Sequence, residues 1–97
     1  MFWCKKFETK YGKVVALCDE ELLGKKIVSK EFNVEISKDF YGERRVDERA
    51  ALRMLKTATM GNFFGKRAVA LAEKNGFILN KNIIFINGIP HAQFIKI

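Results

Sequence analysis

The stretch between residues 47 and 75 carries two apolar stripes that cannot face the same side of one helix. At about 100° per residue, the first stripe consists of Ala51, Met54, Leu55 and Ala58. The second stripe is rotated by roughly 90° from the first and consists of Phe64, Ala68, Leu71 and Ala72. One straight helix would therefore expose half of these side chains to water. The sequence predicts two helices with a break or sharp bend near Thr57–Gly61.

Residues that commonly begin and end helices flank both predicted helices. Asp47 is a good N-cap for the first helix, because its carboxylate can accept a hydrogen bond from a free amide of the first turn. Thr57 or Thr59 is the predicted cap of the second helix. Asn75–Gly76 is its predicted end, since glycine adopts the left-handed conformation at low cost.

The first third of the chain has the composition of β-strands. Residues 1–7 and 13–19 are rich in aromatic and β-branched side chains, and Gly12 suits a turn between them. Residues 31–37 alternate between apolar and polar side chains, as expected of a half-buried strand. The segment between, EELLGKK at 20–26, fits either one turn of helix ended by glycine or a loop.

The last third reads as a hairpin. Residues 82–86 and 91–97 are the two predicted strands, joined by NGIP at 87–90. Asparagine and glycine accept positive φ, and proline holds the preceding residue extended. NGIP is therefore the predicted turn, and His91 is the predicted first residue of the final strand.

Together these segments predict one small α+β domain over residues 1–97. The expected order is β-β-β-α-α-β-β, with a mostly antiparallel sheet and two helices packed on one face. A chain of 97 residues, 48% hydrophobic and 30% charged, is large enough for one core. Its apolar runs are far shorter than the ~20 residues that cross a bilayer, and its first residues do not resemble a secretory signal. We expect a cytoplasmic protein without a membrane partner.

The two cysteines are a candidate pair. A hairpin centred on Tyr11 would place Cys4 opposite Cys18, either as two buried thiols in contact or as a disulfide. The chain has one histidine and neither a CxxC nor an HxxxH spacing, so nothing resembles a zinc site. We expect no bound metal and no cofactor.

His91, Cys18 and Asp19 are the weak catalytic candidates. A cysteine beside a histidine can form a thiolate nucleophile, in a pocket between Cys18-Asp19-Glu20 and Pro90-His91. No local signature supports this pairing, and a hydrogen-bonded histidine at a strand end is the favoured interpretation. An enzyme is therefore an alternative, and a non-enzymatic protein is the prediction.

The segment GNFFGKR at 61–67 has glycines and cations near a predicted helix start. Such a helix end can hold a phosphate through its free amides. It is not a P-loop, because that motif needs one more residue between the glycines and a Ser or Thr where this chain has Arg67. Close packing of Gly61 and Gly65 on the sheet is the favoured interpretation.

A formal net charge of +7 favours a polyanionic partner. The candidate contacts to nucleic acid are Arg44, Arg45, Arg49, Arg53, Lys56, Lys66 and Arg67, with Tyr41, beside Phe40, as a residue that could stack on a base. A charged outer face is also what any soluble amphipathic helix presents. A third hypothesis is a protein–protein adaptor or a homodimer formed through an exposed strand or Phe63.

Four segments carry a resemblance over nearly the whole chain. CDEELLG (18–24), DFYG (39–42), NFFGKRAVALA (62–72) and GIPHAQ (88–93) together resemble a family of small archaeal proteins, the domain of unknown function four-two-four. The resemblance brings no catalytic residues. It implies an archaeal cytosolic protein associated with translation, and therefore favours RNA or a ribonucleoprotein as the partner.

Overall fold

The structure is a computed structural model that describes residues 1–96. Its strands are β1 (Phe2–Thr9), β2 (Gly12–Asp19), β3 (Lys26–Val28), β4 (Asn33–Glu35), β5 (Arg44–Val46), β6 (Met60–Phe64), β7 (Ile84–Ile86) and β8 (Ile89–Ile95). Its helices are α1 (Lys38–Tyr41), α2 (Glu48–Thr57) and α3 (Lys66–Lys74), with 3-10 turns η1 (Glu20–Leu22) and η2 (Asn80–Asn82).

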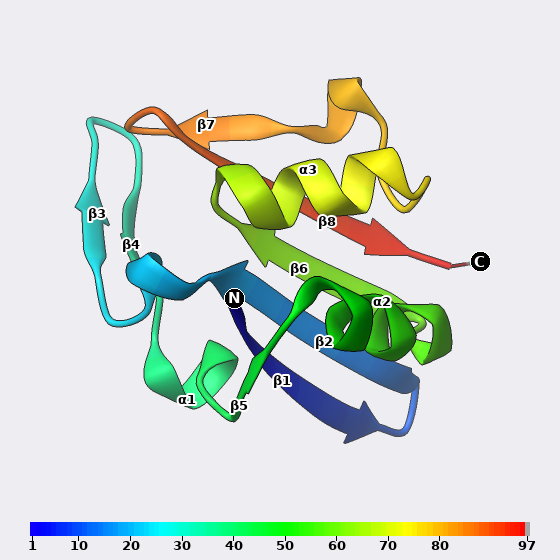
Figure 1. Cartoon of the computed structure of the whole chain (residues 1–97). Coiled ribbons are helices and arrows are strands. Elements are labelled where there is room, and N and C mark those ends of the chain that lie inside the picture. The colour runs from blue at the N-terminus through cyan, green and yellow to red at the C-terminus, as the bar shows by residue number, and fades with distance from the viewer. Residues whose placement is uncertain (97) are drawn as a thin grey trace.

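Six strands form one sheet in the order β5-β1-β2-β6-β8-β7, and β3 pairs with β4 in a separate hairpin. Within the described residues β2 and β6 run parallel to each other, and the other neighbours in the sheet are antiparallel. Figure 1 shows α2 and α3 lying across one face of the sheet, with the β3–β4 hairpin and α1 to one side. The predicted α+β class is confirmed.

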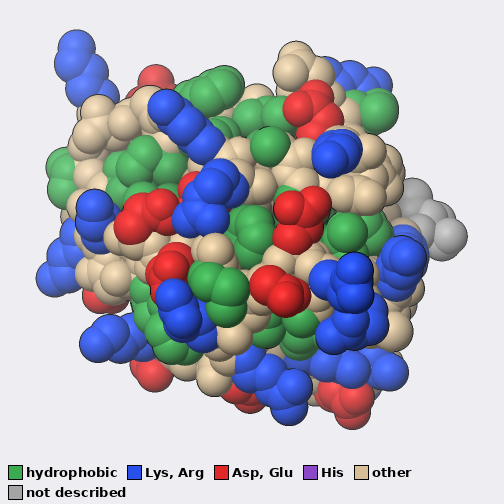
Figure 2. Space-filling model, viewed as in Figure 1, with side chains coloured by type: hydrophobic (Ala, Val, Ile, Leu, Met, Phe, Trp, Pro, Cys, Tyr) green, Lys and Arg blue, Asp and Glu red, His purple; other side chains and the backbone are tan. Residues whose placement is uncertain are grey.

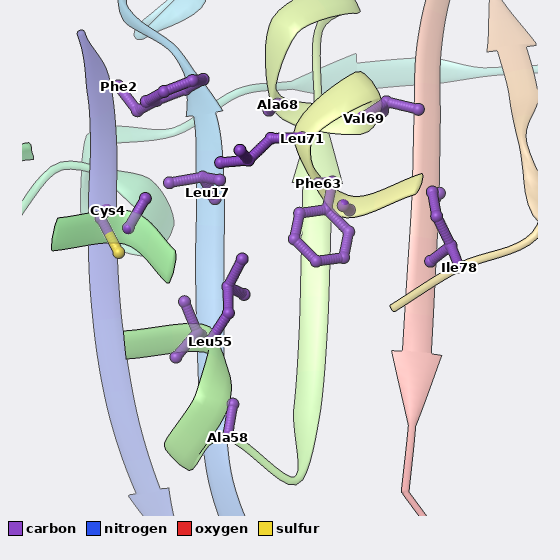
Figure 3. Close-up of a cluster of buried hydrophobic side chains, with 14 of the residues drawn as sticks. Phe2, Cys4, Leu17, Leu55, Ala58, Phe63, Ala68, Val69, Leu71 and Ile78 are labelled. Atoms are coloured by element: carbon purple, nitrogen blue, oxygen red, sulfur yellow. The ribbon is translucent and has the colours of Figure 1, made fainter. Parts of the chain in front are cut away.

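The main core lies between α2, α3 and the sheet. Leu17 and Phe63 are fully buried on the sheet side, and Leu55 and Ala68 meet them from the helices (Figure 3). The predicted apolar stripes of the helices are buried here, apart from Phe64, which belongs to β6, and Met54, which is half-buried.

A second core covers the opposite face of the sheet. Cys18 and Phe64 are buried there beneath Ile36 and Tyr41, which come from the segment containing β3, β4 and α1. This segment belongs to the crossover that returns the chain from β2 to the parallel strand β6. Both faces of the central strands are therefore covered.

The predicted break between the two helices contains a strand. Residues 60–64 form β6, in the interior of the sheet, so the expectation of helix over this segment is wrong. Period-two alternation sends Phe63 into the main core and Phe64 into the second core. Neither Thr57 nor Thr59 caps α3, which begins directly after Gly65.

Most of the predicted helix ends are confirmed. The Asp47 side chain accepts a hydrogen bond from the Ala50 amide at the start of α2. Helix α3 ends at Lys74 with Asn75 as its C-cap, and Gly76 follows with φ of +80°. The undecided segment EELLGKK contains η1, a single 3-10 turn.

The first hairpin is shifted by one residue from the prediction. Thr9 pairs with Gly12, so the turn is Lys10–Tyr11 and Cys4 faces Leu17 rather than Cys18. A shift of one residue moves a side chain to the other face of a sheet. Both cysteines are free, with Cys4 in the main core and Cys18 in the second core, and the expected contact between them is wrong.

The last hairpin has a shorter turn than expected. Asn87 and Gly88 both have positive φ, of 51° and 80°, as a two-residue turn requires. Ile89 and Pro90 already belong to β8, so His91 is its third residue and not its first.

Candidate functional site

The outer side of α2 carries exposed cations. Arg49, Arg53 and Lys56 are exposed, and among residues 1–96 the structure shows no ion pair for any of them. They border a shallow depression of about 390 Å³ together with Leu52 and Glu48. Figure 2 shows Lys and Arg side chains gathered over α2. We call Arg49, Arg53 and Lys56 the α2 cations.

Two of the other predicted contacts are already paired with carboxylates. Arg45 binds Glu20, and Arg67 binds Glu21 while also donating to the Met1 carbonyl at 3.0 Å. The hydrogen bond from Arg45 holds the pKa of Glu20 below its usual range, as expected of a formed ion pair. These two arginines are therefore less available to a phosphate than the α2 cations. Arg44 and Lys66 are exposed.

Tyr41 is buried, and the expectation that it stacks on a base is wrong. Its side chain is 4% exposed, and its hydroxyl donates to the Asn62 Oδ1 at 2.5 Å. Burial raises the pKa of the phenol above its usual value. The neighbouring Phe40 is partly exposed, and its ring stacks on Phe7 with centroids 5.3 Å apart.

The start of α3 is occupied by a carboxylate of the protein itself. Asp19, at the end of β2, accepts hydrogen bonds from the amides of Arg67 at 3.1 Å and Ala68 at 2.7 Å. These are amides that a phosphate would need, so the structure does not support the phosphate hypothesis for residues 61–67. Gly65 packs against Asp19, and Gly61 against Phe94, which favours the packing interpretation.

Cys18 and His91 do not form a catalytic pair. In the sheet Cys18 pairs with Phe64, which pairs with His91, so one strand separates them. With strands about 4.8 Å apart, their backbones are separated by roughly 10 Å. Burial raises the pKa of the Cys18 thiol to about 12, so it is protonated at neutral pH. The hypothesis of a Cys18 nucleophile activated by His91 is therefore wrong, both in the distance it needs and in the thiolate it needs.

His91 is a hydrogen-bonded histidine. Its Nδ1 lies 2.8 Å from the Phe63 carbonyl oxygen, and its ring stacks on Phe64 with centroids 4.4 Å apart. Burial lowers the pKa of the imidazole, so the neutral form dominates near pH 7.

A pocket does lie between the segments that contain Asp19 and Pro90, but it lacks the predicted cysteine–histidine pair. It has a volume of about 350 Å³ and is lined by Asp19, Leu22, Ile89 and Pro90 among others, whereas neither Cys18 nor His91 lines it. Its Asp19 carboxylate is engaged by the α3 amides. Nothing in this pocket supplies a nucleophile and a base together.

A groove larger than this pocket lies on the face of the sheet opposite α2 and α3, and it was not predicted from the sequence. It has a volume of about 530 Å³, and His91, Gln93 and Asn62 lie in its lining. The sequence signal that could have revealed this groove is the period-two spacing of Asn62 with Phe64 and of His91 with Gln93, which places their side chains on one face of the sheet. It was missed because residues 60–64 were expected to be helical.

Residues 1–96 contain neither a cluster of metal ligands nor a helix that could cross a membrane. No three side chains of His, Cys, Asp or Glu gather there as a metal site would require. No helix in this part of the chain has the length and apolar character needed to span a bilayer.

The comparisons with known proteins identify the family. The fold is similar to the crystal structure of an uncharacterized conserved protein from Methanopyrus kandleri, with a TM-score of 0.84 and 24% identity over 99% of this chain and 93% of that one. No curated protein matches. The model of a protein family of unknown function, DUF424, matches residues 7–97. The chain therefore belongs to the DUF424 family, as the four quoted segments indicate.

Proposed function

We propose that this protein is a non-enzymatic binding module that contacts RNA or a ribonucleoprotein through the α2 cations. The observation that carries the proposal is that Arg49, Arg53 and Lys56 are exposed and show no ion pair within residues 1–96, whereas Arg45 and Arg67 are held by glutamates. Cations free of carboxylate partners can exchange their counterions for a phosphate backbone.

The spacing of the α2 cations supports this contact. Residues four and three positions apart lie on one side of a helix. At 1.5 Å per residue the line from Arg49 to Lys56 is about 10 Å long, which spans more than one phosphate of a strand. Arg44 is also exposed, on the edge strand β5 that leads into α2.

The preference for RNA over other polyanions rests on the link to translation that the resemblance implies. The family model itself describes proteins of unknown function. An RNA or ribonucleoprotein partner is the polyanion that agrees with both the charge and this association.

Fluorescence anisotropy with a labelled RNA at low and moderate salt tests the proposal. Three neutralised phosphates predict an affinity loss of roughly 20- to 40-fold between 50 and 200 mM salt. We expect the double variant Arg49→Glu/Arg53→Glu to lose most of the binding.

The matched control is Lys25→Glu/Lys26→Glu, which changes the net charge equally at two exposed residues at the start of β3. It is expected to bind nearly as the wild type. Binding that ignores salt, or equal losses in both double variants, would overturn the assignment of the α2 surface.

An adaptor or homodimer is the second candidate, because β7 is an edge strand with exposed apolar side chains. Ile84 is 46% exposed and Phe85 is 66% exposed, and such edges pair readily with another chain. Phe63 is fully buried and cannot contribute. Light scattering at several concentrations tests this candidate, and a monomer at every concentration would exclude the homodimer.

A further inference from the structure

A concave surface lies on the face of the sheet opposite α2 and α3, and we call it the rear groove. It is the groove of about 530 Å³ described above, and its lining comes from β4, α1, β6, β7 and β8. This volume lies within the range of small-molecule sites. Since α2 lies on the other side of the sheet, the rear groove is separate from the α2 cations.

The floor of the rear groove is a row of polar side chains on two neighbouring strands. Asn62 on β6 pairs with Gln93 on β8, and in the next row Phe64 pairs with His91. Side chains of directly paired residues point to the same face of a sheet. The two carboxamides therefore stand beside each other, next to the imidazole.

Hydrogen bonds fix which atoms these groups offer to a ligand. The Tyr41 hydroxyl donates to the Asn62 Oδ1, which leaves the Asn62 amide nitrogen as a free donor. A carbonyl only accepts, so His91 carries its proton on Nδ1 toward Phe63. Its Nε2 is then an acceptor, 3.5 Å from the Gln93 amide nitrogen. The floor thus offers donors and acceptors side by side.

The walls of the rear groove are apolar and almost uncharged, with aromatic side chains beside the aliphatic Val34, Ile84 and Ile86. Phe32 and Phe40 are 40% and 37% exposed, and Phe64 lies between Tyr41 and His91. Among the described lining residues Glu35 is the one with a full charge, and none is a lysine or arginine. A phosphate would meet a carboxylate here without a cation. An aliphatic group would leave the polar floor without partners.

We propose that the rear groove binds a nucleobase, whose ring contacts the aromatic side chains of the walls and whose edge hydrogen-bonds to Asn62, Gln93 and His91. A planar ring with donors and acceptors on its edge satisfies both the stacking surfaces and the polar floor. The carboxamide pair has the hydrogen-bonding capacity that Asn and Gln use to recognise base edges. This proposal does not depend on RNA binding by the α2 cations.

A titration of the full chain with uncharged ribonucleosides, followed by two-dimensional ¹⁵N NMR, tests the proposal. A ligand of this size in an open groove is expected to bind with a Kd of order 1 mM. The side-chain amide signals of Asn62 and Gln93 are expected to shift and saturate. Shifts located elsewhere, or none at saturating nucleoside, would overturn the proposal.

Two substitutions measure how much Gln93 and His91 each contribute to nucleoside binding. Gln93 is exposed, so Gln93→Ala leaves the fold intact and is expected to weaken binding by about 5- to 10-fold through loss of one hydrogen bond. His91→Phe keeps a ring against Phe64 and removes the acceptor, with a similar loss. Asn80→Ala, at an exposed amide outside the groove, is the control with unchanged binding. Unchanged Kd in both groove variants would refute the assignment.

A second set of titrations identifies where the base comes from. In the variant Arg49→Glu/Arg53→Glu, a short single-stranded RNA that shifts the Asn62 and Gln93 signals at lower concentration than its nucleosides would identify a base within a strand. Equal affinity per base at these signals would identify a free nucleoside, and both results support the rear groove. The variant Arg49→Glu/Arg53→Glu is expected to retain nucleoside binding. The two proposals can therefore fail separately.

Discussion

The carboxylate of Asp19 occupies the space that a β-carbon on Gly65 would need. An ideal β-carbon built there would lie 2.4 Å from the Asp19 Cγ, and Gly65 has φ of +109°. The same carboxylate accepts the two amide hydrogen bonds at the start of α3. This contact joins the end of β2 to the turn between β6 and α3, so it fixes the helix on the sheet.

We expect Gly65→Ala to lower the free energy of unfolding by about 2–5 kcal/mol, because it adds backbone strain and a clash with a buried group. Urea unfolding monitored by circular dichroism measures the change. Gly76→Ala is the matched control: Gly76 has φ of +80° and nothing within 4 Å of an added β-carbon. It is expected to lose only about 1–2 kcal/mol. Equal losses would show that the Asp19 contact is unimportant.

We expect Asp19→Ala to destabilise the protein more than Asp47→Ala. Both carboxylates accept amide hydrogen bonds at a helix start, but Asp19 is 6% exposed and accepts two, whereas Asp47 is exposed and accepts one. Loss of an exposed N-cap typically amounts to about 1 kcal/mol. One buried and one partly buried amide left without an acceptor raise the loss at Asp19 to about 2–4 kcal/mol. The same unfolding experiment measures both, and the reverse order would contradict the structure.

We expect two free thiols, both unreactive in the folded protein. Cys4 and Cys18 are fully buried on opposite faces of the sheet, and burial raises the pKa of each to about 12. A thiol-specific reagent at neutral pH is expected to modify neither cysteine in native conditions and both in denaturant. A missing thiol in denatured, unreduced protein would indicate a disulfide and refute the register of the first hairpin.

Stability is expected to fall on mild acidification because of His91. Burial lowers the pKa of the folded imidazole below its ordinary value of 6.5, so the unfolded chain binds more protons as the pH passes below 6.5. The free energy of unfolding therefore decreases below about pH 6.5 and levels off below the folded-state pKa. His91→Phe is expected to remove this dependence. An imidazole pKa at or above 6.5 by NMR would contradict it.

Helix α2 and the end of helix α3 could be predicted from the sequence because their determinants are local. Asp47 lies one residue before α2, and the stripe that includes Leu55 repeats with the helical period. Gly76 follows Asn75, the C-cap of α3. None of these features depends on residues distant in the chain.

Strand β6 could not be recognised because its pairing partners are distant in sequence. Its parallel neighbour β2 ends more than forty residues earlier, and β8 lies on its other side. Residues 60–64 contain no β-branched residue, and their two phenylalanines also fit a helix. Burial on both faces of the sheet, which is a tertiary property, overrides this weak local preference.

The first hairpin shows how little separates the two cysteine arrangements. A turn centred on Tyr11 places Cys4 opposite Cys18, whereas the two-residue turn Lys10–Tyr11 places the thiols on opposite faces. Both turns fit the polar composition of the segment. Packing of alternate side chains into two different cores decides the register.

The sequence by itself determined the class of fold, the excess of positive charge and the helix that displays Arg49 and Arg53, because composition and periodicity are local. Only the tertiary structure decided which cations are free, since Glu20 and Glu21 reach Arg45 and Arg67 across long separations in the chain. It also separated Cys18 from His91 and placed His91 beside Asn62 and Gln93, because strand order and register depend on packing of the whole chain.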